Sequence, residues 1–246
     1  MKLTLTAAAW IVGGALLTAS IAVPASHAAP AKKMMAKKKP MKKPMGKSGM
    51  APLPIVLPTP AFTGTPKNIL AGTTVEKPTG KPRPAFYAPK GVKNLAKGRP
   101  VTSSDAAPII GSLDLVTDGS KEATDGSWVE LGPGTQWVQI DLGKAASIYA
   151  IVLWHYHGEA RVYRDVVVRV SNDADFITGV KTIFNNDNDN SSGQGIGPKS
   201  DHEFYEFAEG RLMNAKGVKG RYVRLYSKGN TSDDQNAYTE VEVWGK

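Results

Sequence analysis

The most concentrated chemistry in this sequence lies in residues 155–163, which read HYHGEARVY. Side chains two positions apart on a strand point to the same side, so the imidazoles of His155 and His157 could both reach one ligand or one metal ion. A catalytic metal site needs a third protein ligand, and Glu159 follows too closely to supply it at a usual spacing. The guanidinium of Arg161 and the ring of Tyr163 are groups that bind sugar hydroxyls and sugar ring faces. A sugar-binding loop is therefore the favoured interpretation, and a metal-dependent enzyme is the alternative.

The segments that flank this loop alternate between apolar and polar side chains. In residues 166–170 the valines occupy alternate positions on one side, and the same period of two recurs in residues 221–226 and 240–244. A period of two in β-branched and aromatic residues indicates strands with one buried face and one wet face. Roughly the last 150 residues contain no helical apolar stripe. The sequence therefore predicts an all-β fold.

Strand parity predicts which loops share an end of this fold. If successive strands alternate in direction, residues 155–163, 185–202 and 228–237 emerge at one end, with residues 172–179 and the C-terminus at the other. The first three loops are rich in His, Arg, Asn, Asp and Tyr, which bind sugars by hydrogen bonds and ring stacking. The side chains predicted to bind a ligand are His155, His157, Arg161, Tyr163, Asn230, Asn236 and Tyr238. Ordinary polar loops are the alternative, because loops are polar in most proteins.

Five phrases occur in a fixed order along the chain: NLAKGRPVTSS from Asn94, QWVQIDLG from Gln136, the Ile-Val-Leu strand after it, RYVRLY and TEVEVWG. In this order and at these separations they resemble the discoidin, or coagulation-factor type C, domain family. The resemblance covers residues 94–246 and implies a jelly-roll β-sandwich. The bacterial branch of that family includes galactose-binding-like carbohydrate modules, whereas other members bind lipid head groups or proteins. In the carbohydrate-binding members the ligand lies among loops at one end of the sandwich.

The resemblance also implies a structural Ca²⁺ ion, which the family often holds with a D-G-x-x-x-T loop and a Glu at the start of the final strand. Asp118, Thr124 and Glu240 match that pattern, although Thr124 comes one residue late. Carboxylate, hydroxyl and carbonyl oxygens suit this hard cation. A second candidate is the run DNDNS from Asp187, which resembles the first ligands of a calcium loop but has Pro198 at the twelfth position. The alternative there is a turn whose Asx side chains hydrogen-bond their own backbone.

The N-terminal part of the chain divides by composition into three segments, and the sandwich is expected over residues 93–246. Residues 1–28 combine a lysine, an apolar run and a small-x-small cleavage site, which predicts a signal peptide. A retained membrane anchor is the alternative, but the run is short and dominated by Ala and Gly. Residues 29–50 are rich in Lys and Met and contain no acid, so a disordered tail is expected. Residues 51–92 are Pro-rich, which is typical of a linker.

The charge of the chain is divided unevenly between these segments. The formal net charge is +9, but residues 1–90 hold 14 basic residues against one acid, and residues 91–246 hold 17 basic against 21 acidic residues. The expected sandwich is therefore mildly acidic, which argues against sequence-specific nucleic-acid binding. A lysine-rich tail binds polyanions without sequence specificity, and in an exported protein the partner would be an anionic envelope polymer. A solvated spacer is the alternative for this tail.

Several function classes are excluded by what the sequence lacks. There is no cysteine, so zinc ribbons, thiol catalysis and disulfide frameworks are excluded. There is also no nucleophile elbow, P-loop or dinucleotide fingerprint. We therefore expect an exported, secreted or periplasmic, non-catalytic module that recognises carbohydrate at the cell surface or in the extracellular matrix. The alternative from another class is a structural or adhesion protein that binds a protein partner or the anionic envelope.

Overall fold

The computed structural model describes residues 49–64 and 74–246. The predicted signal peptide and nearly all of the predicted lysine-rich tail lie outside these residues. Within the described ranges, no helix is long and apolar enough to cross a membrane.

The described chain is β-structure with a single short 3₁₀ helix, η1, at Leu113–Thr117. The ten strands are β1 (Met50–Pro52), β2 (Tyr87–Pro89), β3 (Lys93–Asn94), β4 (Val101–Ser103), β5 (Val129–Leu131), β6 (Gln136–His155), β7 (Val167–Ser171), β8 (Lys181–Asn185), β9 (Arg211–Ser227) and β10 (Asn236–Gly245).

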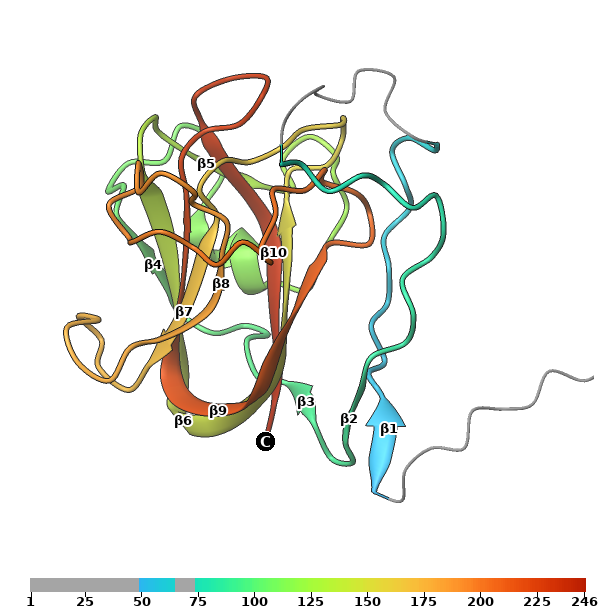
Figure 1. Cartoon of the computed structure of the whole chain (residues 1–246), viewed down its shortest axis with the longest axis vertical. Helices are drawn as coiled ribbons and strands as arrows, with labels where there is room; N and C mark the ends of the chain where they lie inside the picture. The colour runs from blue at the N-terminus through green and yellow to red at the C-terminus, as the bar shows by residue number, and fades with distance from the viewer. Residues whose placement is uncertain (1–48, 65–73) are drawn as a thin grey trace, which may run out of the picture. The chain divides into compact units, whose positions relative to one another are not determined.

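Two long strands, β6 and β9, pair with each other along most of their length and bend together (Figure 1). Their register shifts between Asp141 and Ala146 and again between Ile148 and Ala150. Before the bend β6 also pairs with β4, and after the bend it pairs with β10. On the far side of β9, β7 and then β8 continue the first layer. The bent pair joins two antiparallel layers, so the predicted all-β jelly-roll sandwich is confirmed.

The alternation read from the sequence sets the core between the two layers. The inward side chains of β6, β7, β9 and β10 are fully or almost fully buried and belong to one apolar cluster. These side chains include Val138, Ile140, Ile151, Leu153, Val168, Val170, Val223, Leu225, Val241 and Val243. On this inner face the predicted period of two is confirmed.

The outer face of β10 differs from the prediction, because it is buried as well. Glu240 has no exposed surface, and Glu242 and Trp244 are about as deeply buried. Trp244 packs with Trp154 in a second apolar cluster, against residues from the segment that precedes the sandwich. An added layer of chain therefore covers a face that alternation alone predicts to be wet.

That layer is an antiparallel ribbon of β1 and β2, in the segment predicted to be a linker. Leu53, Ile55 and Phe86 contribute side chains to the Trp154–Trp244 cluster, and the Leu53 amide donates to the Phe86 carbonyl at 2.9 Å. Polar contacts hold the same segment further along. The Arg83 guanidinium donates to the Gly210 carbonyl at 2.7 Å. The described parts of residues 51–92 thus pack on the sandwich, because their apolar side chains find an uncovered apolar face.

We expect the ribbon to contribute measurably to stability. Replacing Leu53 and Ile55 by Ala should each lower the free energy of unfolding by about 1–2 kcal/mol, because each side chain is partly buried against the tryptophans. Val56→Ala is the matched control, since this neighbour is 74% exposed and its loss should matter by less than about 0.5 kcal/mol. Urea unfolding followed by tryptophan fluorescence measures all three. Equal stability of the three variants would show that the ribbon does not hold the sandwich.

Candidate functional site

Loops from distant parts of the chain meet at one end of the sandwich. Tyr163 forms a β-bridge with Asn230, and Val162 forms one with Tyr205. β6 both starts and finishes at this end, because it bends in its middle. The Tyr163–Asn230 bridge agrees with the predicted clustering of residues 155–163 and 228–237. A hydrogen bond from Lys228 to Ser191 brings residues 185–202 to the same end.

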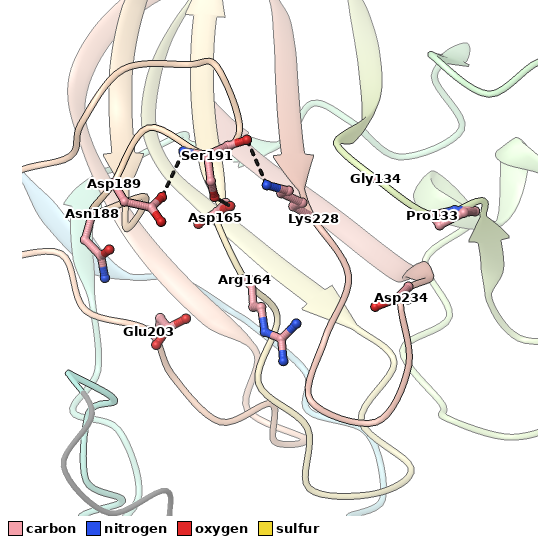
Figure 2. A pocket seen from close by; sticks show the side chains of 10 residues that line it. All are labelled: Pro133, Gly134, Arg164, Asp165, Asn188, Asp189, Ser191, Glu203, Lys228 and Asp234. Carbon is pink, nitrogen blue, oxygen red and sulfur yellow. Dashed lines mark hydrogen bonds between the residues drawn. The ribbon is translucent and has the colours of Figure 1, made fainter.

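A polar hollow of about 380 Å³ opens where these loops meet (Figure 2). Its walls come from the turn before β6, the β6–β7 loop, the β8–β9 loop and the β9–β10 loop. The lining residues are Pro133, Gly134, Arg164, Asp165, Asn188, Asp189, Ser191, Glu203, Lys228 and Asp234. Four carboxylates and two basic groups face one space, and no aromatic ring is among them.

Ser191 connects three of the loops that form this hollow. Its hydroxyl donates to Asp165 Oδ2 at 2.5 Å, and its amide donates to Asp189 Oδ1 at 2.8 Å. Its carbonyl accepts a hydrogen bond from Lys228 Nζ at 2.9 Å, as Figure 2 shows. These bonds fix one wall of the hollow, so its shape does not depend on a ligand to assemble it.

The rest of that wall is organised by Asp187, which is fully buried. Its Oδ2 accepts hydrogen bonds from the Ser192 amide at 3.0 Å and the Ser192 hydroxyl at 2.5 Å. Its Oδ1 accepts from the amides of Asp189 and Ser191, both at 3.2 Å. This is the Asx-type turn that was the alternative to a calcium loop. Asp165, Asp187 and Asp189 nevertheless bring one carboxylate oxygen each within 4.8 Å of one another.

Three other charged groups of the lining make no side-chain hydrogen bond within the described chain. They are the exposed guanidinium of Arg164 and the carboxylates of Glu203 and Asp234. Burial raises the pKa of the Glu203 carboxyl, the charge of Asp165 raises it further, and Arg164 opposes both. Burial also raises the pKa of Asp165. These groups are ready to bind a polar ligand, since their hydrogen-bonding capacity is not used inside the protein.

Most of the predicted ligand-binding side chains are buried, and none of them lines the hollow. His155 has no exposed surface, and its Nδ1 lies 2.6 Å from Glu206 Oε1 in a buried pair. Its ring stacks on Tyr163 at 4.1 Å between centroids and contacts Tyr238 at 4.8 Å. His157 is 1% exposed, and its Nε2 lies 2.9 Å from a backbone carbonyl. These four side chains pack the end of the core.

The two predicted asparagines are also buried. Asn236 Nδ2 donates to the carbonyls of Gly132 and Gly134, and its Oδ1 accepts from the Gly229 amide. Asn230 accepts from two amides of its own loop and donates to Asp233 Oδ1 at 2.5 Å. Both amides therefore use their hydrogen bonds to fix loop backbones.

Arg161 has 14% of its side chain exposed and is held by two acids. It pairs with Asp233 Oδ2 at 2.9 Å and with Glu159 Oε1, and its guanidinium lies over the ring of Tyr156 at 4.9 Å. Its donors are therefore directed at the protein. The direct ligand contacts predicted for the seven side chains need correction, because six are buried and the seventh is engaged in ion pairs.

Five of the ten residues that line the hollow belong to the predicted loops, and the other five lie outside them. None of the ten was among the side chains predicted to bind a ligand. Arg164 directly follows the predicted loop 155–163, and Asn188 and Asp189 lie inside the loop 185–202. The sequence contained one signal. A polar residue that lies beyond the end of a strand's apolar alternation faces solvent more often than a polar residue that continues the alternation. Arg164, between the buried Tyr163 and Val166, fits that description.

The alternative of a His155–His157 metal site finds no third ligand in the described chain. The one group of three potential His, Cys, Asp or Glu ligands within residues 49–64 and 74–246 is the aspartate group of the hollow. The buried Nδ1 of His157 and Nε2 of His155 have no hydrogen-bond partner among those residues.

The three residues predicted to hold calcium fall into two environments. Glu240 is fully buried, its Oε2 accepts from the Gly119 amide at 3.1 Å, and its Oε1 has no partner within the described residues. Burial raises the pKa of Glu240 to about 9, and the neighbouring charge of Asp118 adds to this rise. Thr124 is exposed and its hydroxyl lies 2.8 Å from Ser127 Oγ. An orphaned, buried carboxylate oxygen next to a second acid fits a cation, whereas Thr124 is engaged elsewhere.

Comparison with known proteins agrees with this geometry. Residues 115–225 match the sequence model of the F5/F8 type C family described as "NedA-like, galactose-binding domain". This match confirms the resemblance of the sandwich to the F5/F8 type C, or discoidin, domains. Among curated proteins, none matches this sequence.

Three solved structures illustrate what the fold of this sandwich is similar to. One is the CBM32 module of AlyQ in complex with 4,5-unsaturated mannuronic acid. The two sequences are 20% identical, the match covers 58% of this chain and 92% of that chain, and the TM-score is 0.43. Another is chitosan-binding module 1 of a chitosanase/glucanase from Paenibacillus sp. IK-5: 20% identity, 62% and 99% coverage, TM-score 0.41. The third is the Streptococcus pneumoniae fucose binding module SpX-3: 16% identity, 61% and 96% coverage, TM-score 0.42. At these values the likeness assigns no ligand to this chain.

We expect His155 to matter for stability and not for direct ligand contact. His155→Ala should lower the free energy of unfolding by about 3–5 kcal/mol, because Glu206 would remain buried without its partner. His155→Gln, which keeps an amide donor in the same space, should lose less. Thermal unfolding by circular dichroism measures both. If His155→Ala unfolds like the unchanged protein, the buried pair is not a structural element.

Proposed function

We propose that this sandwich is a non-catalytic carbohydrate-binding module, and that its ligand lies in the polar hollow at the loop end. The observation that carries the proposal is a set of three charged groups in that hollow, Arg164, Glu203 and Asp234, which make no side-chain hydrogen bond within the described residues. The bonds of Ser191 hold another part of the same lining in place. The family description as a galactose-binding domain supports the class of ligand.

The chemistry of the hollow suits the edge of a sugar ring. A carboxylate accepts hydrogen bonds from two neighbouring hydroxyls, and a guanidinium donates two parallel hydrogen bonds to oxygen acceptors. With no aromatic ring in the lining, recognition comes from hydroxyl positions and not from the apolar face of the ring. We infer a ligand held by directional polar contacts, in a shallow site that water also reaches.

Export to the cell surface is part of the same proposal. It rests on the signal-peptide pattern of residues 1–28, which lie outside the described structure. A binding module without a catalytic site fits this location, because its role would be to hold the protein to a glycan surface.

We expect Arg164→Ala to weaken glycan binding by about 1.5–3 kcal/mol while the fold is kept, because Arg164 is exposed and its guanidinium makes no hydrogen bond within the described chain. A glycan array with galactose-containing structures selects the ligand, and calorimetry on the best binder measures the loss. Arg221→Ala is the matched control, since Arg221 pairs with Asp141 near the bend at the opposite end. Full binding by Arg164→Ala, or equal losses in both variants, would rule out this hollow.

We also propose that Glu240 and Asp118 hold a structural Ca²⁺ ion. The support is the orphaned Glu240 Oε1, buried beside Asp118 and the backbone of the loop that contains it. A divalent cation there would keep the buried carboxylate ionised and satisfy its free oxygen. Thr124 is not needed for this site, since its hydroxyl lies against Ser127.

If calcium binds there, it should raise the melting temperature with increasing Ca²⁺ concentration, because it stabilises only the folded state. A chelator should reverse the shift, and Glu240→Gln should abolish the response. Asp187→Ala tests the other candidate loop and should leave the response intact. Differential scanning calorimetry of the three proteins measures this. A calcium response lost in Asp187→Ala but kept in Glu240→Gln would move the ion to the aspartate group.

A further inference from the structure

A second hollow lies away from the loop end, beside the ribbon. It is lined by Met50, Ala85, Phe86, Tyr87, Pro89, Tyr149, Asn214 and Lys216 and measures about 380 Å³. Tyr149 belongs to β6 near its bend, and Asn214 pairs with its neighbour Ala150. Because both ends of β6 lie at the first hollow and its bend lies at the other end, the two hollows occupy opposite ends of the sandwich.

The second hollow is lined by aromatic rings and a basic group, whereas the first is lined mainly by acidic and other polar groups. Three aromatic rings line the second hollow, and Tyr87 is 38% exposed. Its polar groups are the amide of Asn214 and the ammonium of Lys216, both on exposed residues, and its lining contains no carboxylate. Within the described residues, the hydroxyls of Tyr87 and Tyr149 make no hydrogen bond. The side-chain nitrogens of Asn214 and Lys216 make no hydrogen bond or ion pair there either. Only the oxygen of Asn214 is used, by the Lys216 amide at 3.0 Å.

The backbone holds these groups in place without help from a ligand. Tyr87 lies on β2, whose partner β1 is Met50–Pro52. Gly217 approaches the Tyr149 ring so closely that a Cβ there would meet Cε1 at 3.3 Å. Lys216 adopts a left-handed backbone with φ of 53°, and the hydrogen bond to Asn214 secures this turn. Aromatic faces, an amide and an ammonium are thus presented together on rigid elements.

We propose that this second hollow binds an acidic saccharide, with a sugar ring against Tyr149 and Tyr87 and a carboxylate at Lys216. Exposed aromatic faces pack on the C–H face of a sugar, and the lone ammonium selects for negative charge. Sequence adjacency favours the same class of ligand. Residues 32–47 carry eight lysines, and the last of them, Lys47, is three residues before Met50. Acidic polymers bind such lysine-rich segments through counterion release.

This site is independent of the carbohydrate site proposed at the loop end, because it shares no lining residue with it. One domain would then engage two saccharide segments at opposite ends, which raises the strength of attachment to a polymer without any new contact. The acidic first hollow would disfavour uronates, so the two sites would take different sugars.

The test uses the full chain with polygalacturonate as the acidic probe and dextran as the neutral one, followed by affinity electrophoresis. Tyr149→Ala should weaken polygalacturonate binding by about 3- to 10-fold, and Tyr149→Phe should keep it, because the ring face and not the hydroxyl supplies the stacking. Tyr149 is outside the buried core, and thermal melts confirm the fold of each variant. Lys216→Asn removes the positive charge, and asparagine tolerates the left-handed backbone at this position. This variant should bind polygalacturonate more weakly, and its binding should depend less on salt concentration.

Arg164→Ala separates the two sites and should leave polygalacturonate binding unchanged. Deletion of residues 29–48 measures the share of the lysine-rich segment, and the Tyr149→Ala effect should persist in that background. Unchanged polygalacturonate binding in both Tyr149→Ala and Lys216→Asn would overturn the proposal and assign the binding to the lysines alone. Dextran bound as tightly as polygalacturonate would overturn the acidic specificity. Loss of binding in Arg164→Ala would place the acidic ligand in the first hollow.

Discussion

The pairing of β6 with β9 through a shared bend is the constraint on which the rest of the structure depends. Thirteen residue pairs join the two strands, and the register shifts twice near the bend. Because the strands are inner members of both layers, every other strand of the sandwich is placed relative to them. The bend also brings the two ends of β6 to the same end of the molecule. This is how the turn at Pro133 and the loop at Arg164 come to line one hollow.

The end of the sandwich where the loops meet is held by buried polar contacts. The His155–Glu206 pair links the end of β6 to the loop before β9, and Asn236 ties β10 to the turn before β6. Asp187 holds the β8–β9 loop together from within, through hydrogen bonds to Ser191 and Ser192. Loops of irregular backbone need such partners, because an unpaired amide or carbonyl away from water costs free energy. The side chains left over, Arg164 among them, are the ones available to a ligand.

Much of the fold could be predicted from the sequence, since alternation of apolar residues is a local property. The inner faces of β7, β9 and β10 and the end at which the loops gather followed from period and parity. The direction in which each loop side chain points could not be predicted, because a loop has no regular period. Asp165, for example, adopts a left-handed backbone with φ of 51°, which nothing in its neighbours specifies. Polar types such as His155 and Asn236 suit a ligand and a buried network equally well.

The ribbon over Trp154 and Trp244 was missed for a different reason. The proline content of residues 51–92 is typical of a linker, yet Leu53 and Ile55 are two positions apart and both face the tryptophans. A short alternation hidden among prolines was the available signal. Its partner surface, the outer face of β10, becomes visible only when the sandwich is assembled. Long-range packing of this kind is not encoded in a local pattern.

The hollow at the loop end is the proposed glycan-binding site. The most direct measurement is a map of backbone amide chemical shifts as the glycan selected on the array is titrated into the isotopically labelled protein. Binding in this hollow should shift the amide resonances of Gly134, Arg164, Asn188, Ser191, Glu203 and Asp234, with little change at residues 172–179. Shifts confined to residues 172–179 or to the outer faces of the sheets would contradict it.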